Sequence, residues 1–170
     1  MDYWAKFKQN CESSGVSVGL IMCDHVGDLA DADNNVRMKA VEAHYKWVDV
    51  ASFLGAGAIR VNASGEGEAV EIAENAVDGL SKLGAYAASK GINIVVENHG
   101  GISSDGQWLS GVIKNVGMDN VGTLPDFGNF CVKEGDDGCV EEYDKYKGIA
   151  ELMPYAKGVS AKSHNFDENG

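Results

Sequence analysis

The strongest constraint in this sequence is the regular alternation of short apolar runs with longer segments of helical periodicity. Five runs have β-type composition and begin roughly 30 to 40 residues apart: Val16–Cys23, Ala58–Asn62, Asn93–Glu97, Val121–Asp126 and Gly158–Lys162. Between them, apolar residues recur at spacings of three and four within residues 40–54, 70–87, 108–113 and 146–153. Repeated strand–helix–strand units predict an α/β fold with a parallel sheet.

Residues at the expected ends of these helices agree with the pattern. Asp33 and Ser104 are candidate N-caps, and Gly55 and Gly91 stand where helices are expected to end. The helical segments are therefore bounded, and each leads into the next strand.

Polar residues at the carboxyl ends of the strands favour a barrel over an open sheet. An open doubly wound sheet concentrates its site at one switch point, whereas a (β/α)8 TIM barrel draws functional residues from many strands. Such residues follow every run here: Asp24, His25, Arg60, Asn62, Glu97, Asn98, His99, Asp126, Asn129, Lys162 and His164. A complete barrel needs about 250 residues. We therefore expect residues 1–170 to form one partial barrel domain of about five βα units, lacking strands at both ends.

Two carboxylates are the leading candidates for chemistry. Glu97 closes an apolar strand and precedes a polar, glycine-rich loop, and Asp126 ends the next strand. Glu97 as a helix cap and Asp126 as an Asx turn are the structural alternatives. Carboxylates on adjacent parallel strands repel each other and must share a proton or a cation. Oxygen ligands with at most one imidazole favour Mn²⁺ or Mg²⁺.

Alternating residues on two other strands extend the candidate site. Ser160, Lys162 and His164 share one face of the last run, so Lys162 or His164 can meet a metal or a substrate. For His164, a surface position beyond the strand is the alternative. Arg60 needs an anionic partner if it is buried, and a structural ion pair with Glu97 is its expected role.

Charge and composition exclude several classes of function. The net charge of −12 disfavours nucleic-acid binding, and no apolar run approaches the length of about 18 residues that would span a membrane. The first residues lack the apolar core of a signal peptide. Of the four cysteines, Cys131 and Cys139 could form a loop disulfide, but reduced thiols in a cytoplasmic protein are the preferred interpretation.

Five segments together resemble the sugar phosphate isomerase/epimerase family, the xylose-isomerase-like TIM barrels: IMCDHVGDLAD, IRVNASG, VVENHGG, GTLPDFGNF and KGVSAKSHNFDENG. The resemblance implies that the five strands are the third to seventh of eight. It also implies a divalent metal held by Glu97, Asp126, a His and a final Glu on an eighth strand that this chain lacks. The His position corresponds to Ser160, Lys162 or His164, and His164 is the imidazole among them. DNA-repair endonucleases of the superfamily carry additional His ligands, and Asn62 and Asn129 at two of those positions argue against a nuclease.

The function implied by this resemblance is metal-dependent isomerisation or epimerisation of a sugar or sugar phosphate through an enediolate, with Glu97 as one of two proton-transfer groups. The expected substrate-binding residues are His25, Asn62, His99, Asn129 and Lys162. For His25, an exposed loop position is the alternative. The alternative functions are a keto-polyol dehydratase on the same barrel and a truncated, non-catalytic remnant. A homo-oligomer is a further possibility that the sequence does not decide.

Overall fold

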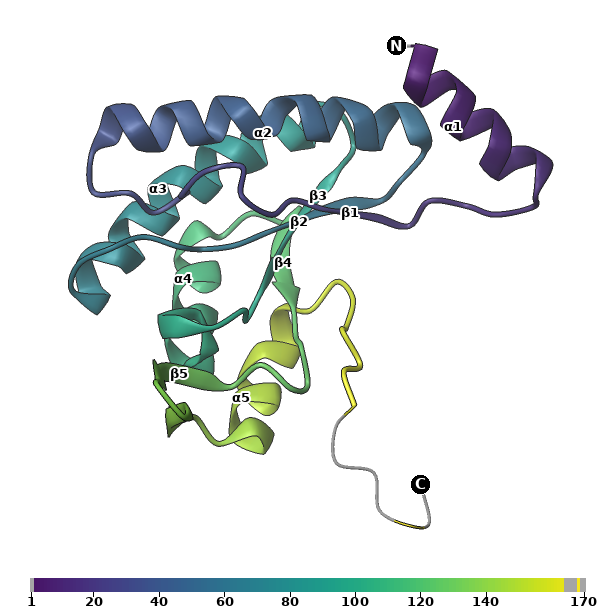
Figure 1. Ribbon diagram of the computed structural model, residues 1–170. Helices are drawn as coiled ribbons and strands as arrows, with labels where there is room; N and C mark the ends of the chain where they lie inside the picture. The colour runs from purple at the N-terminus through teal and green to yellow at the C-terminus, as the bar shows by residue number, and fades with distance from the viewer. Residues whose placement is uncertain (1, 164–167, 169–170) are drawn as a thin grey trace.

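The computed structural model describes residues 2–163 and residue 168 of the chain. Four parallel strands form its main sheet in the order β1 (Leu20–Met22), β2 (Ala58–Val61), β3 (Asn93–Glu97) and β4 (Val121–Leu124). The register aligns Met22 with Arg60, Arg60 with Val95 and Val95 with Gly122 across the sheet. Four of the five expected strands are therefore confirmed (Figure 1).

Helices follow the strands in the expected alternation. They are α2 (Asn34–Leu54), α3 (Ala69–Ala88), α4 (Gly106–Val116) and α5 (Lys145–Leu152), with short 3-10 turns η1 (Gly101–Ser104) and η2 (Met153–Tyr155). Each of these helices contacts the next, and Figure 1 shows α2, α3 and α4 following one another around one side of the strands. None of the helices in the described part of the chain is long and apolar enough to cross a membrane.

The helix ends follow from capping chemistry, with one correction. The Asp33 side chain accepts from the backbone at the start of α2, and Gly55 ends that helix in the left-handed conformation at φ 78°. The expected cap Ser104 is wrong for α4, because Asp105 accepts from the Trp108 N–H at 2.9 Å. The hydroxyl of Ser104 instead accepts a hydrogen bond from the Gly100 N–H.

Alternation along the strands divides the sheet into two different faces. Ile59, Val61, Ile94 and Val96 point into the apolar core beneath the helices. The alternating residues Arg60 and Val95 occupy the other face, which is the barrel interior in a closed barrel. A parallel sheet covered by helices on one face, with a polar residue buried on the other, is the architecture of an incomplete TIM barrel.

The expected fifth strand, Gly158–Lys162, is wrong as a continuous strand. Residues 156–160 lie beside β4 but pair with it through two isolated parallel bridges, Thr123 with Ala156 and Asp126 with Ser160. Between the two bridges, the segment 156–160 therefore contains one more residue than the segment 123–126. Pro125 explains the interruption, because it has no N–H to donate to the neighbouring segment.

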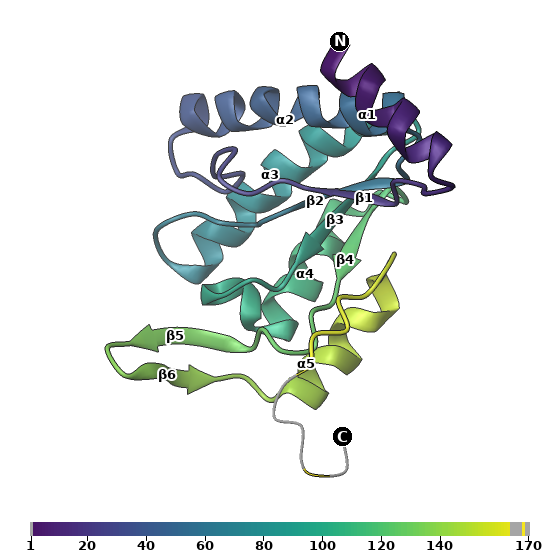
Figure 2. The same ribbon diagram turned by 45° about the vertical axis from the view of Figure 1, so that its right-hand side comes forward.

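Two further elements have no counterpart in the sequence-based expectation. Helix α1 (Asp2–Ser13) contacts α2, and Trp4 meets Trp47 edge to face at 6.2 Å between ring centroids. After β4, strands β5 (Cys131–Gly135) and β6 (Gly138–Glu142) form an antiparallel hairpin, which extends away from the main sheet in Figure 2.

A disulfide between Cys131 and Cys139 crosses this hairpin. The preferred expectation of reduced thiols is therefore wrong for this pair, whereas Cys11 and Cys23 are free. Disulfides persist in oxidising compartments, so this bond weighs against the cytoplasmic location, which stays a prediction.

Candidate active site

The carboxyl ends of all four strands meet at one edge of the sheet and carry polar residues there. Asp24 follows β1, Asn62 follows β2, Glu97 ends β3 and Asp126 follows β4. Glu97 and Asp126 are buried, with 3 % and 2 % of their surfaces exposed. The structure thus brings the two predicted carboxylates to the same buried edge, from adjacent strands.

Arg60 is the positive charge nearest to Glu97. Its Nε lies 2.7 Å from Glu97 Oε2, and both side chains are almost completely buried. The distance is that of an ion pair, yet neither atom has a hydrogen-bond partner of acceptable geometry. The expected charge pairing is present, and Glu97 Oε2 keeps a lone pair that no donor in the described residues uses.

A second contact of Arg60 ties it to the end of β1. Its Nη1 donates to Asp24 Oδ1 at 2.5 Å and to Asn62 Oδ1 at 3.3 Å. The hydrogen bond from Arg60 holds the pKa of Asp24 below its usual range. Arg60 therefore links the ends of three strands from the interior face of the sheet.

Burial raises the pKa of Glu97 above its usual value of 4.5, and the nearby negative charge of Asp126 raises it further. Arg60 acts in the opposite direction but does not cancel the effect of burial. A carboxyl group with a raised pKa is better suited than an ordinary carboxylate to accept and return a proton.

Both oxygens of Asp126 are engaged in hydrogen bonds. Oδ1 accepts from the Gly128 N–H at 2.8 Å, which is the Asx turn considered from the sequence, and Oδ2 accepts from the Ser160 hydroxyl at 2.6 Å. Ser160 is one of the three residues that the resemblance allowed at the third ligand position. Its hydroxyl places another oxygen beside the carboxylate.

Two cavities flank the loop that follows Glu97. One of about 160 Å³ is lined in part by Asn62 and His99, and one of about 260 Å³ in part by His99, Asn129 and Lys162. Lys162 Nζ donates to Asn129 Oδ1 at 2.8 Å, which fixes both side chains at the second cavity. Four of the five expected substrate-binding residues thus line these two cavities, although their role in binding stays a prediction.

The fifth, His25, lies elsewhere. It is exposed after β1 with φ 55°, a backbone conformation that is uncommon for residues other than glycine, and it lines neither cavity. His164, the expected imidazole ligand, lies outside the described residues.

Asn98 is a buried residue that the sequence placed among the polar residues at the strand ends but to which it assigned no role. Its side chain has 0 % exposure and bonds to the main chain of the loop after β4. The sequence signal was its place directly after Glu97, but an Asn in a site loop has no distinctive spacing.

The donor set suits a hard divalent cation. Glu97 contributes a buried carboxylate whose Oε2 lies beside Arg60, and Asp126 contributes a second buried carboxylate from the adjacent strand, with the Ser160 hydroxyl beside it. Mg²⁺ is commonly held by one or two carboxylates, with water completing its shell. Within residues 2–163 and 168, no group of three or more His, Cys, Asp or Glu side chains surrounds a common point. The fit therefore rests on two carboxylates.

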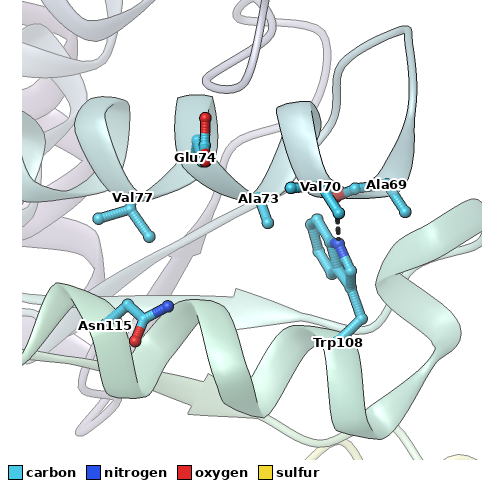
Figure 3. Close-up of a pocket in the computed structure, with 7 residues that line it drawn as sticks. All are labelled: Ala69, Val70, Ala73, Glu74, Val77, Trp108 and Asn115. Atoms are coloured by element: carbon cyan, nitrogen blue, oxygen red, sulfur yellow. Dashed lines mark hydrogen bonds between the residues drawn. The ribbon is translucent and has the colours of Figure 1, made fainter.

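A larger cavity of about 470 Å³ lies away from these residues, in the helix layer between α3 and α4 (Figure 3). Ala69, Ala73, Val77 and Trp108 form much of its lining, and the Trp108 indole N–H donates to the Ala69 carbonyl at 2.8 Å. Its mainly apolar lining provides few groups for catalysis. The carboxyl edge of the sheet is the better candidate, because it carries the two buried carboxylates.

Solved structures with the same fold include two proteins named as sugar epimerases and a protein in complex with magnesium. The 3-keto-D-glucoside 4-epimerase YcjR from E. coli superimposes with a TM-score of 0.75 at 14 % identity, covering 93 % of this chain and 63 % of that one. A xylose isomerase-like TIM barrel protein from Mycobacterium smegmatis in complex with magnesium gives 0.74 at 18 % identity, covering 99 % and 59 %. A D-psicose 3-epimerase solved with D-fructose gives 0.71 at 16 % identity, covering 93 % and 56 %.

At these identities the similarity shows the fold, and the chain spans about three-fifths of the length of these structures. No protein of curated function matches the sequence. A profile of the family described as Xylose isomerase-like TIM barrel matches residues 1–168, nearly the whole chain. The chain therefore belongs to the xylose isomerase-like TIM barrel family.

Proposed function

We propose that this chain is part of a metal-dependent sugar isomerase or epimerase, and that it forms a single partial-barrel domain carrying two of the metal ligands. The observation that carries the proposal is the buried pair Glu97 and Asp126, two carboxylates that adjacent strands hold at the carboxyl edge of the sheet. The fold relatives named for epimerisation of sugars and for a magnesium complex support the same reaction class.

Glu97 and Asp126 would hold the cation, with Mn²⁺ or Mg²⁺ preferred because the donors are oxygens. A bound divalent cation supplies Lewis acidity, which makes a C–H next to a carbonyl easier to deprotonate. Ser160 holds Asp126 in place by donating to Oδ2. Water and substrate oxygens would supply further ligands of the cation.

Glu97 is also the group that we propose to accept the substrate proton. Burial raises its pKa, so that its carboxyl can hold and return a proton more readily than an exposed glutamate. Arg60 Nε lies 2.7 Å from Glu97 Oε2, and its positive charge stabilises the ionised Glu97 carboxylate with which the reaction would begin. A second proton-transfer group on the opposite face of the substrate would invert its configuration.

The substrate is proposed to lie in the cavities on either side of His99. Asn62, His99 and Asn129 offer amide and imidazole groups that can bind hydroxyls, and Lys162 offers a cation at the outer edge. These groups suit a polyhydroxylated molecule of small size.

The proposal is tested by calorimetric titration of the full chain with Mn²⁺. We expect binding by the wild-type chain and its loss in both Glu97→Gln and Asp126→Asn, because each variant removes an anionic ligand while keeping the shape of the side chain. Glu74→Gln is the matched control, since Glu74 lies on α3 at the outer cavity. Unchanged affinity in both site variants would contradict the metal-site proposal.

The reaction class is tested separately, by incubating candidate ketoses with the chain and Mn²⁺ in deuterated water. Incorporation of deuterium without loss of water from the sugar is expected for an isomerase or epimerase. Loss of water would instead indicate a dehydratase on the same barrel.

A further inference from the structure

Asn98 connects the end of β3 to the loop after β4 through both ends of its side-chain amide. Its Oδ1 accepts from the Asp126 N–H at 2.7 Å, and its Nδ2 donates to the Asp126 carbonyl at 3.0 Å and to the Asn129 carbonyl at 2.8 Å. The side chain is fully buried. One amide group therefore makes three hydrogen bonds to the main chain of two residues.

These two residues have roles in the proposed site. Asp126 carries the carboxylate at the end of the strand next to that of Glu97, and Asn129 lines the cavity next to His99. Asn129 in turn accepts from Lys162, so the contacts continue from the sheet to the outer wall of the cavity. Asn98 follows Glu97 directly in the sequence. The main chain that carries the proposed ligand Glu97 therefore also carries the side chain that holds the other proposed ligand, Asp126.

The ladder between β3 and β4 does not fix this loop. The last paired residues are Glu97 and Leu124, and Asp126 lies two residues further along, beyond Pro125. Pro125 cannot donate a hydrogen bond, so the main chain is less constrained at this point. On the side of β3, the amide of Asn98 replaces the missing backbone ladder.

We propose that Asn98 is a positioning residue of the proposed metal site, which sets the main chain of Asp126 and Asn129 at a fixed place relative to Glu97. The inference rests on the proposed function for the role of the two carboxylates. In this role Asn98 resembles residues of other metalloproteins that orient a metal ligand by hydrogen bonding. Removal of such residues typically lowers metal affinity by about 10–100-fold.

Two variants separate the halves of the clamp. Asn98→Ala removes all three hydrogen bonds, whereas Asn98→Asp keeps an acceptor for the Asp126 N–H and loses the donor to both carbonyls. Asn120→Ala is the matched control, because Asn120 Nδ2 donates to the Gly84 carbonyl at 2.8 Å and to the Ile92 carbonyl at 3.4 Å at the opposite end of the sheet. It removes a comparable clamp without touching the site.

The first readout is Mn²⁺ affinity by calorimetry on the full chain. We expect both Asn98 variants to lose about 10–100-fold in affinity, while Asn120→Ala stays within about twofold of wild type. Equal losses in Asn98→Ala and Asn120→Ala would show a general effect on folding and overturn the proposal. Full affinity in the Asn98 variants would also overturn it.

The second readout needs no metal. Amide hydrogen exchange should be faster at Asp126 in Asn98→Ala and close to wild type at Asp126 in Asn98→Asp. If Asn98→Ala fails to fold, Asn98→Leu still decides through its Mn²⁺ affinity, because it keeps about the volume of the side chain, removes the same three hydrogen bonds and adds no charge. If wild type binds no Mn²⁺ but Asp126 exchange rises in Asn98→Ala, the positioning is upheld and the proposed function fails. Unchanged exchange in Asn98→Ala would refute the positioning itself.

Discussion

Replacing Arg60 with methionine tests how strongly the fold depends on one charge inside the sheet. Methionine keeps most of the apolar volume of the arginine stem, so the main loss is the guanidinium group. Glu97 then remains 97 % buried beside Asp126 without its countercharge. Asp24 loses its partner as well, but its side chain is 44 % exposed and is solvated by water.

The expected loss follows from these two environments. Breaking a buried ion pair by removing one partner costs about 3–5 kcal/mol, whereas the exposed contact with Asp24 adds about 0–1 kcal/mol. Domains are stable by about 5–15 kcal/mol, so the variant should lose a large share of its free energy of unfolding. The total loss is about 3–6 kcal/mol, so at about 2–4 °C per kcal/mol for a domain of this size, Tm should fall by roughly 6–24 °C.

The loss should also depend on pH. Without Arg60 the pKa of folded Glu97 rises further above its unfolded value of 4.5. A group whose folded pKa is raised binds its proton more tightly in the fold, so the cost of ionising it grows as pH rises above 4.5. Arg60→Met should therefore be closer to wild type at about pH 5 than at about pH 8.

Urea denaturation followed by tryptophan fluorescence measures this free energy, since the chain has three tryptophans. The double variant Arg60→Met/Glu97→Gln is the control, because it removes both charges and should recover most of the loss. A loss below about 1 kcal/mol in the single variant, or no recovery in the double variant, would refute the assignment of a buried pair.

Burial holds the pKa of His44 below its usual 6.5, so the free energy of unfolding should fall as pH drops through that value, and His44→Gln should weaken this dependence in urea titrations. Gly79→Ala should cost about 1–3 kcal/mol, because its Cβ would lie 2.1 Å from the Leu29 carbonyl oxygen. Gly111→Ala, with open space at its Cβ, should instead stabilise α4 by up to about 1 kcal/mol in thermal melts. Replacing both cysteines of the β5–β6 hairpin with serine should destabilise it locally by about 2 kcal/mol and speed its cleavage in limited proteolysis.

Most of the central fold could be predicted, because each of its helices and strands buries one face and this burial produces a regular spacing of apolar residues in the sequence. The spacings that indicated residues 40–54 and 70–87 lie within α2 and α3, and β2 and β3 are found almost as expected. Helix α1 has no buried residues, and β6 is exposed along its whole length. Neither has a buried face whose period could be recognised in the sequence.

The candidate site was predictable where residue type and strand end coincide. Glu97, Asp126 and the contact of Arg60 with Glu97 follow from strand register and alternation. Asn98 could not be chosen in this way, because its partners lie 28 and 31 residues further along the chain. Such a contact depends on how the loop after β4 bends, which local sequence does not specify.

The interruption at Pro125 has a consequence for how this chain can change in evolution. Side chains alternate along the segment beside β4, and its one additional residue brings Ser160, rather than Val159, to the Asp126 carboxylate. An insertion or deletion that shifts this register by one residue would present Val159 or Ala161 to Asp126 in place of the serine. At this point of the fold, the register of the segment beside β4 determines which side chain meets the carboxylate.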